Sequence, residues 1–269
     1  MRLSDKVALI TSAQHPCAQA IVLAFAREGA NCVIVDDDGA RAETLAASVR
    51  SSGCRALALH SDVTDKAAVE EMVRRTLAEF GRIDILLNCS ATEHDKDFLS
   101  FSEDAFNRCI ERGPKAYFLA SQAVGRVMSE QRAGKIINLS TTDGRIGSGE
   151  STGNSAAASS IESLTRAIAQ ALGFYGVNCN AIVTGPLNSF SGTSEEVGER
   201  MRRIPLGRLA KPEDMIGAAL LLASDEASYI SGESICIDAG YHNAAVTEDA
   251  FRPAWGKVWG NFEIPPHRK

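Results

Sequence analysis

The chain has 269 residues, of which 45% are hydrophobic, and a formal net charge of −6. This apolar content is sufficient for one substantial core, and an α/β chain of this length commonly folds as a single domain. The negative balance, with no basic run longer than Arg74-Arg75 or Arg202-Arg203, argues against nucleic acid as a partner.

The sequence also disfavours a membrane protein and a metal-binding protein. No apolar run approaches the ~20 residues of a membrane span, and no basic and apolar leader precedes the first strand, so we expect a cytoplasmic protein without a membrane partner. The seven cysteines lie far apart and include no C-x-x-C pair. We therefore expect reduced core thiols, with no metal site and no disulfide.

The first ninety residues alternate between short apolar runs and helical patterns. Apolar residues at helical spacing mark the helices, as Ile21, Val22 and Phe25 do in the first one. The predicted strands are 7–10, 31–35, 56–60 and a run that ends at Asn88, and the predicted helices are 19–27, 40–51 and 65–80. This alternation favours a doubly wound α/β fold with a mainly parallel sheet.

The second half continues the alternation. It contains a long helix at 106–122, a buried strand at 136–139, a helix at 154–172 and a strand at 177–182. Gly113 and Pro114 interrupt the first of these helices. We expect a kink there, because proline lacks the N–H donor and crowds the preceding turn.

Several of these segments resemble motifs of the short-chain dehydrogenase/reductase family. They are 11–18, where the family has Thr-Gly-x-x-x-Gly-x-Gly, the strand 81–88, the segment 135–169, and 205–240, which begins PLGRLAKPEDM. The resemblance covers roughly residues 3–243 and implies a single-domain Rossmann fold with a seven-stranded, mainly parallel sheet. Residues 244–269 follow it as an aromatic C-terminal extension.

The family's catalytic segment runs Asn-hydrophobic-Ser-Ser, a glycine loop and Tyr-x-x-x-Lys, with the Tyr as proton donor or acceptor. In register with Asn138, the resemblance places Thr141 at the Ser position, Asn154 at the Tyr position and Ala158 at the Lys position. Gly113 falls where the family has a proton-relay Asn. Since none of these side chains is a general acid or base near neutral pH, no catalytic residue is expected. Asn154 is interpreted either as a hydrogen-bonding replacement for the Tyr or as a helix N-cap.

The cofactor loop also departs from the family pattern, because Ser12, Pro16 and Ala18 replace its three glycines. Those glycines let the backbone turn sharply, approach the pyrophosphate and pack the helix against the strand. We therefore expect no cofactor bound to this chain, in a cleft that is closed or weak.

Three further residues match the cofactor side of the family pattern. Asp36 ends the second strand, where an acid binds the adenosine ribose in NAD-preferring relatives. It is interpreted either in that way or as part of a solvated turn, 36–39, that caps the next helix. Asp62 belongs to the Asp-Val pair that contacts adenine in the family, and Asn88 lies where the family's Asn mainly stabilises the sheet.

The resemblance also implies how the chain assembles. In the family, the helices corresponding to 106–122 and 154–172 pack against their mates in a second subunit, and the small residues 156–158 favour close approach there. Residues 188–203 correspond to the mobile substrate lid. Trp255 and Trp259 in the extension belong to a residue type enriched at interface hot spots, and they are predicted to pack against another subunit or back over the cleft.

These observations favour a catalytically inactive subunit, a pseudoenzyme, that pairs with an active paralogue of the family in a heterotetramer. The paralogue would be an NAD-dependent dehydrogenase of a short-chain alcohol or β-hydroxyacyl thioester, and it would hold the NAD. Two alternatives stay open. One is an enzyme that reuses the cleft without redox chemistry, through Thr141, Asp143, Asn154 or His15, and the other is a homo-oligomer that binds a ligand.

Overall fold

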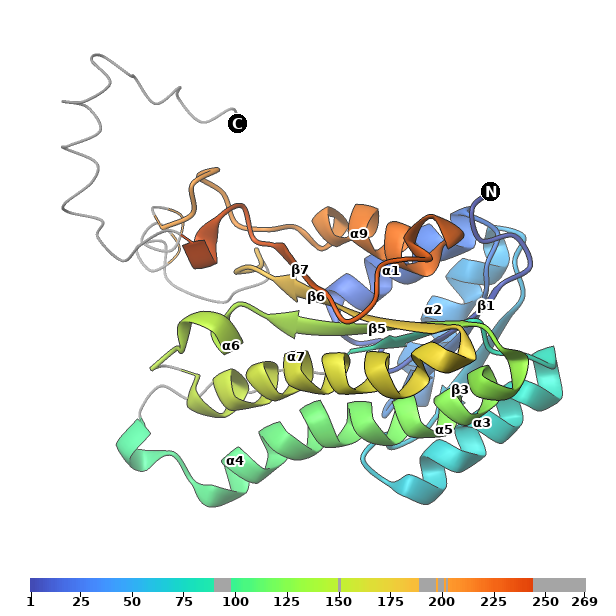
Figure 1. Cartoon of the computed structure of the whole chain (residues 1–269), viewed down its shortest axis with the longest axis horizontal. Coiled ribbons are helices and arrows are strands. Elements are labelled where there is room, and N and C mark those ends of the chain that lie inside the picture. Colours follow the sequence, from blue (N-terminus) through green and yellow to red (C-terminus); the bar gives the residue numbers. More distant parts are fainter. Residues whose placement is uncertain (90–97, 150, 189–196, 198–200, 202, 244–269) are drawn as a thin grey trace, which may run out of the picture.

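The computed structural model describes residues 1–89, 98–149, 151–188, 197, 201 and 203–243. Its centre is a seven-stranded sheet in the order β3-β2-β1-β4-β5-β6-β7 (Figure 1). The strands are β1 Val7–Ile10, β2 Asn31–Asp36, β3 Ala56–His60, β4 Ile85–Asn88, β5 Gly134–Thr141, β6 Val177–Thr184 and β7 Ser234–Ile237. Every neighbouring pair is parallel, so the predicted fold class is confirmed.

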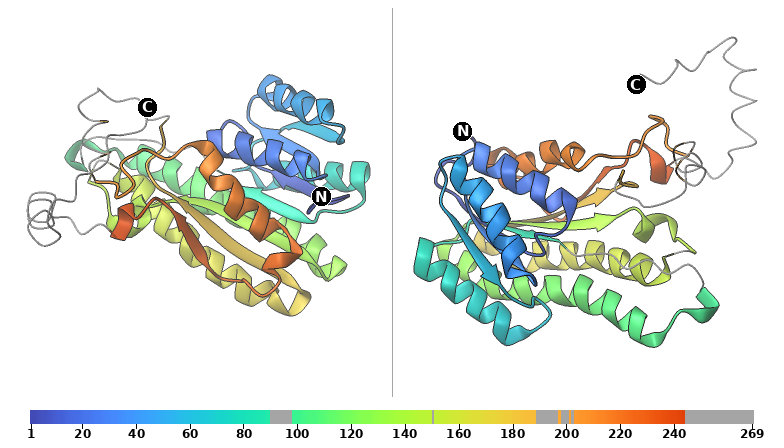
Figure 2. Two further views of the ribbon diagram at one scale, coloured as in Figure 1. Left: turned by 90° about the horizontal axis from the view of Figure 1, so that it is seen from above. Right: turned by 180° about the vertical axis from the view of Figure 1, so that it is seen from behind.

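Helices cover both faces of the sheet. One face carries α1 Pro16–Arg27, α2 Gly39–Ser51 and α9 Ile216–Ala223, and the other carries α3 Lys66–Phe80, α5 Ala116–Gln131 and α7 Thr152–Leu172 (Figures 1 and 2). Each face holds its own apolar core. The strand order reverses between β1 and β4, which places a crevice for ligands at the carboxyl ends of these strands.

Capping side chains explain where several helices begin. Asp38 accepts hydrogen bonds from the N–H groups of Ala40 and Arg41, at 2.9 and 3.2 Å, and Asp65 accepts from Ala68 N–H at 2.7 Å. The expectation that the 36–39 turn caps the next helix is therefore right for Asp38. The extended backbone of both caps separates the strands before them from the helices after them.

Helix α7 begins at Thr152, two residues before the predicted start. Ser155 N–H already donates to Ser151 C=O at 2.8 Å, so the first helical turn closes ahead of Asn154. Asn154 lies inside the helix and is only 5% exposed. Its interpretation as an N-cap is wrong.

The predicted kink at Gly113-Pro114 is present. Helix α4, Glu103–Ile110, passes into a π-helical turn, Glu111–Lys115, and then into α5. Gly113 has φ −91° and ψ −107°, a non-helical conformation, directly before Pro114. The long helix therefore bends where proline removes a hydrogen bond from the ladder.

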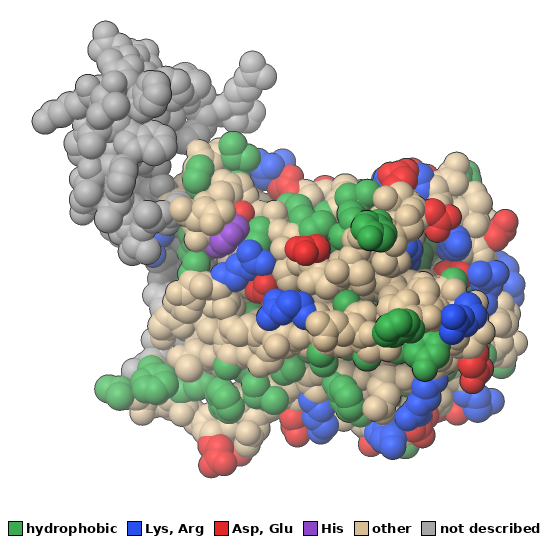
Figure 3. Space-filling view, in the orientation of Figure 1, with side chains coloured by type: hydrophobic (Ala, Val, Ile, Leu, Met, Phe, Trp, Pro, Cys, Tyr) green, Lys and Arg blue, Asp and Glu red, His purple; other side chains and the backbone are tan. Residues whose placement is uncertain are grey.

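The surface carries mixed charge. On the face shown in Figure 3, Lys and Arg side chains lie among Asp and Glu side chains, and no broad basic patch forms on its described part. Within the described residues, no helix is both long and apolar enough to cross a membrane. The predicted lid lies largely, and the predicted tryptophan contacts entirely, outside the described residues.

Candidate functional site

A small cavity joins the four positions to which the family pattern assigns the chemistry. It has a volume of about 30 Å³ and is lined by His15, Cys109, Gly113, Leu139, Ser140, Thr141, Asn154, Ala157, Ala158 and Ile161. Gly113 comes from the π-helical turn, Thr141 from the end of β5, and Asn154 and Ala158 from α7. The structure adds His15 from the loop after β1, whereas Asp143 does not line the cavity.

The cavity has little chemistry available for proton transfer. Among the described residues, its lining contains no Lys, Tyr, Asp or Glu, and its space corresponds to about two water molecules. Burial lowers the pKa of His15 to about 4, so its imidazole is neutral at neutral pH. The buried Thr141 Oγ1 has no hydrogen-bond partner.

Close packing around α7 keeps this cavity small. A Cβ atom at Gly113 would lie 3.3 Å from the Ala157 Cβ, and one at Gly144 would lie 2.8 Å from the Ala158 Cβ. Ala157 and Ala158 are therefore buried within their own chain, at 6% and 5% exposure. This corrects the expectation that residues 156–158 form a small-residue patch for a second subunit, since two of the three are used internally.

An ion pair holds the segment after β5 against α7. Arg145, in the short helix α6 Asp143–Ile146, contacts Glu162 of α7 with Nη2 to Oε2 at 2.8 Å and Nε to Oε2 at 3.1 Å. The same guanidinium donates to the carbonyl of Ser234 on β7 at 3.1 Å. Glu162 is 7% exposed, so this largely buried pair ties α6 to α7 and β7.

Three N–H groups in the loop after β1 and at the start of α1 donate to acceptors within the protein. Ala13 N–H donates to Val35 C=O at 3.2 Å, His15 N–H donates to Ser12 C=O at 3.2 Å, and Cys17 N–H donates to His15 Nδ1 at 3.2 Å. Pro16 is the first residue of α1 and has no N–H to offer. Ser12 has φ +48°, the left-handed conformation that glycine adopts without strain.

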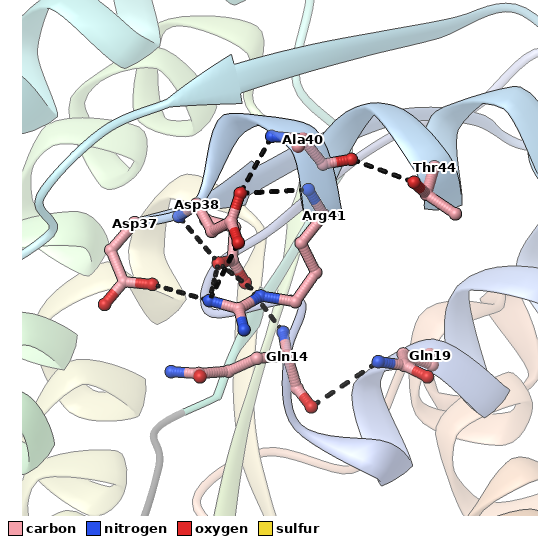
Figure 4. A network of polar contacts seen from close by, with 8 residues as sticks. Gln14, Gln19, Asp37, Asp38, Ala40, Arg41 and Thr44 are labelled. Carbon is pink, nitrogen blue, oxygen red and sulfur yellow. Dashed lines mark hydrogen bonds and ion pairs between the residues drawn. The ribbon is translucent and has the colours of Figure 1, made fainter.

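Asp36 at the end of β2 accepts hydrogen bonds from Gln14, Asp38 and Arg41, which Figure 4 labels. Its Oδ2 accepts the Gln14 N–H at 2.7 Å, while Oδ1 accepts the Asp38 N–H at 2.9 Å and Arg41 Nε at 3.0 Å. Asp36 is 1% exposed, so the view of it as a solvated turn residue is wrong. Its carboxylate instead ties the loop after β1 to the start of α2.

A larger cavity of about 300 Å³ lies beside this network. It is lined by Ser12, Gln14, Asp36, Asp37, Ser61, Asp62, Val63, Thr64, Arg108, Glu111 and Arg112. Asp62 accepts the Thr64 N–H and Oγ1–H at 2.8 and 2.7 Å. These bonds, with Arg112 and Lys115 nearby, lower the pKa of the Asp62 carboxyl.

Asn88 supports the sheet, as expected. Its Nδ2 donates to Asn138 Oδ1 at 2.9 Å and to Ser121 Oγ at 3.0 Å. Asn138 Nδ2 in turn donates to Thr165 Oγ1 at 2.9 Å, so the chain of bonds joins β4, β5, α5 and α7. All four residues are buried, which makes this a satisfied internal network apart from the free Asn88 Oδ1.

Comparison with known proteins identifies the family. A family model described as enoyl-(acyl carrier protein) reductase matches residues 13–242. Galactitol 2-dehydrogenase of Agrobacterium fabrum is 36% identical to this chain over 258 residues, which cover 89% of this chain and 98% of that protein. The chain belongs to the short-chain dehydrogenase/reductase family.

Two further relatives of this short-chain dehydrogenase/reductase bear on its function and fold. The (2S)-[(R)-hydroxy(phenyl)methyl]succinyl-CoA dehydrogenase subunit BbsD of Thauera aromatica is 31% identical, with 89% of this chain and 98% of that protein covered. The crystal structure of levodione reductase superposes with a TM-score of 0.86 at 28% identity and covers 90% of this chain and 100% of that one. The seven-stranded fold is thus that of the family.

The described residues at the start of α1 and in the small cavity do not match the family pattern for a nicotinamide dinucleotide. The start of α1 should offer N–H donors to a pyrophosphate, but the N–H groups of Ala13, Gln14, His15 and Cys17 are bonded within the protein and Pro16 has none. The adenosine side keeps about 300 Å³, whereas the catalytic side has about 30 Å³.

Metal and thiol chemistry lack a centre in the part of the chain that the structure describes. No group of three or more His, Cys, Asp or Glu side chains lies close enough together there to hold a metal ion. The seven cysteines are all free of disulfides, and five are buried. Burial raises the pKa of Cys17, Cys32 and Cys179 to about 12, so these are protonated core thiols.

The sequence did not point to two ion pairs, Arg41 with Asp36 and Arg145 with Glu162. Arg41 neutralises Asp36, and a basic residue in the first turn of a helix, where the macrodipole disfavours it, was the available signal. The Arg145–Glu162 pair spans 17 positions and joins the short helix α6 to α7, so no spacing in the sequence pointed to it.

Proposed function

We propose that this chain is a catalytically inactive subunit that assembles with an active, NAD-dependent member of the same family. The observation that carries the proposal is the small cavity. The four positions to which the family pattern assigns substrate binding and proton transfer meet there, as Gly113, Thr141, Asn154 and Ala158. None of these side chains exchanges a proton near neutral pH.

The rest of the scaffold supports a role in assembly. The buried Asn88–Asn138–Thr165 network and the complete seven-stranded sheet are intact, and both serve folding rather than hydride transfer. Phe106 on α4 and Phe118 on α5 are 38% and 45% exposed, on helices that pack between subunits in the family. A partner surface there would remove both aromatic rings from water.

The expected complex is a heterotetramer of two inactive and two active chains, with NAD held by the active ones. The active chain would oxidise a short-chain alcohol or a β-hydroxyacyl thioester. The named relatives support this choice, since one is a galactitol 2-dehydrogenase, which acts on an alcohol, and another is a subunit of a (2S)-[(R)-hydroxy(phenyl)methyl]succinyl-CoA dehydrogenase, which acts on a thioester.

Isolation of the untagged protein from its source cells tests the proposal. We expect a second family member to co-elute, to be identified by mass spectrometry, and to account for all NAD-dependent turnover. Turnover by the pure chain at the rate of an ordinary dehydrogenase, or a stable monomer in solution, contradicts the proposal.

The C-terminal extension gives a second test. Truncation after Asn243 is expected to weaken the complex more than it lowers the free energy of unfolding of the isolated chain. A full-length Trp255→Ala/Trp259→Ala variant is the matched control, because it removes the aromatic rings without shortening the chain. Unchanged affinity of both variants for the partner would refute a role of the extension in assembly.

The larger cavity favours a second candidate function, a homo-oligomer that binds a small ligand. Its volume of about 300 Å³ lies at the lower limit for small-molecule sites. A single-component oligomer by light scattering, whose Tm rises with a metabolite, would favour this candidate over the paired subunit. The cleft-reusing enzyme has less support, since the cavity that joins His15, Thr141 and Asn154 has room for about two waters.

A further inference from the structure

Two cysteines lie close together at the start of the edge strand β3. Cys32 belongs to β2, and Cys54 lies two residues before β3 begins. The Cys32 N–H donates to the Arg55 carbonyl at 3.0 Å, and the Cα of Cys32 pairs with that of Ala56 in the parallel register. Cys54 is therefore the direct neighbour of the residue to which Cys32 is bonded.

Both thiols point into the same apolar core, on the side of the sheet that carries α1, α2 and α9. The Cys54 thiol donates to the Ala26 carbonyl at 3.2 Å, and the Cys32 thiol donates to the Ala30 carbonyl at 3.8 Å. These carbonyls lie at the end of α1 and in the turn after it, so both sulfur atoms lie beneath one short segment. Burial, and then the nearby Cys54, raise the pKa of the Cys32 thiol to about 12.

The two thiols differ in their access to solvent. Cys32 is fully buried, whereas Cys54 is partly exposed. Gly53, directly before Cys54, has φ +90°, and among the described residues no atom lies within 4 Å of the place that a Cβ would take there. An oxidant from solvent therefore reaches Cys54 first, and the chain beside Cys54 has room to move toward Cys32.

We propose that Cys54 and Cys32 form a peroxide-sensitive thiol pair, in which Cys54 is oxidised first and Cys32 then closes a disulfide with it. Neither cysteine lines either of the two cavities, and both lie toward the amino ends of their strands, away from the cleft at the carboxyl ends. The pair needs no cofactor and no partner subunit, so it is independent of the proposed function.

The reaction consumes one hydrogen peroxide and proceeds in two steps. The Cys54 sulfur first attacks one peroxide oxygen, the O–O bond breaks, and the departing hydroxide takes the thiol proton and leaves as water. Cys54 is then a sulfenic acid. The Cys32 sulfur attacks the Cys54 sulfur, the S–S bond forms, the S–O bond breaks, and the hydroxide leaves as water with the Cys32 proton. The two thiols lose two electrons in total, and the peroxide becomes two waters.

The disulfide changes how the edge of the sheet is held. It closes a loop that contains all of α2, and it joins β2 to the turn before β3 by a covalent bond. Strand β3 is paired with β2 alone, so this bond reinforces the outermost ladder of the sheet. A cross-link of this kind restricts the unfolded chain, and a thiol reductant removes it.

Peptide mapping of the full-length protein tests the pair. The folded protein is treated with a small excess of hydrogen peroxide, free thiols are blocked with N-ethylmaleimide, and the non-reduced digest is analysed by mass spectrometry. The variants are Cys54→Ser and Cys32→Ala. Cys236→Ser is the matched control, because Cys236 is also partly exposed but lies among Arg145, Asp238 and Glu162.

We expect the wild type and Cys236→Ser to give one cross-linked pair of peptides, Cys32 with Cys54, that dithiothreitol separates. In Cys32→Ala no resolving thiol is present, so Cys54 should remain a sulfenic acid and take up roughly 10-fold more dimedone than in the wild type. In Cys54→Ser, Cys32 should stay reduced, because burial shields it from peroxide.

Three results overturn the proposal: a Cys54 that stays reduced or stops at the sulfenic acid in the folded wild type, a Cys32–Cys54 disulfide that forms only in urea, or loss of that disulfide in Cys236→Ser. Circular dichroism shows whether each variant is folded, and the wild-type map decides the question even where a variant is not. The isolated chain can lack the disulfide and still be an inactive subunit, so the two proposals fail independently.

Discussion

The main-chain N–H of Gln14 donates to the carboxylate of Asp36 at 2.7 Å, within a network that also includes Arg41 (Figure 4). This bond joins the loop after β1 to the end of β2, the two segments from which the family binds a dinucleotide. A main-chain donor of the loop after β1 is thus paired with a carboxylate acceptor at the end of β2.

Replacement of Asp36 by Asn should destabilise the protein. The variant loses a buried charge that accepts two main-chain N–H groups and the Arg41 guanidinium, and we expect a loss of about 1–3 kcal/mol in the free energy of unfolding. Asp37→Asn is the matched control, because the Asp37 side chain is 54% exposed and should change stability by about 0.5 kcal/mol or less. Urea denaturation measures both, and equal effects would contradict the structure.

His15 should make stability depend on pH. Its pKa is about 4 in the folded protein and 6.5 in the unfolded chain, so above pH 6.5 neither state takes up the proton. As pH falls from 6.5 to 4, only the unfolded chain is protonated, and the folded state loses about 3 kcal/mol. The free energy of unfolding of His15→Asn, measured by urea denaturation, should fall less over this range than that of the wild type, and an equal fall would contradict the prediction.

Restoring the family's residue pair should not restore activity. In Asn154→Tyr/Ala158→Lys the new side chains enter a cavity of about 30 Å³, and Gly144 packs directly over Ala158. We expect no NADH oxidation with carbonyl substrates at 340 nm and a loss of about 1–3 kcal/mol in stability from overpacking. Ser160→Lys, on the exposed side of α7, should leave stability nearly unchanged. Measurable turnover by the double variant would show that the cleft still opens.

Two threonines should respond oppositely to the same substitution. The Thr141 hydroxyl is buried without a partner, so Thr141→Val should be neutral or stabilising. The Thr165 hydroxyl accepts from Asn138 Nδ2 at 2.9 Å and donates to Ile161 C=O at 2.8 Å, so Thr165→Val should cost about 1–3 kcal/mol. Thermal unfolding of the two variants tests whether the Thr141 hydroxyl lacks a hydrogen bond. A large fall in the Tm of Thr141→Val would mean that this hydroxyl has a partner.

Most of the fold could be predicted because apolar runs report burial directly. The predicted strands 7–10 and 56–60 coincide with β1 and β3, and the core residues Ile21, Val22 and Phe25 are fully buried. Helix starts were less predictable, as the early start of α7 shows. Its first turn closes through main-chain bonds, which no side chain in the sequence reports.

The site could be predicted only in part. Register with Asn138 correctly grouped Thr141, Asn154 and Ala158, because a strand end and one helix face fix their relative positions. The ion pairs and close packing around the cleft join separate elements of the fold, as Arg41 with Asp36 and Gly144 with Ala158 show. Side-chain partners and cavity volumes of this kind follow from tertiary packing, so the sequence could not supply them.

Ser12 has a left-handed backbone conformation at a position where the family pattern has glycine. Its φ of +48° costs a non-glycine residue about 1–2 kcal/mol, yet the turn is held by hydrogen bonds from Ala13 and His15 rather than by its own residue type. A superposition of backbones alone would count this loop as a cofactor loop. The partners of its main-chain N–H groups decide whether such a loop is available to bind a ligand or is bonded within the protein.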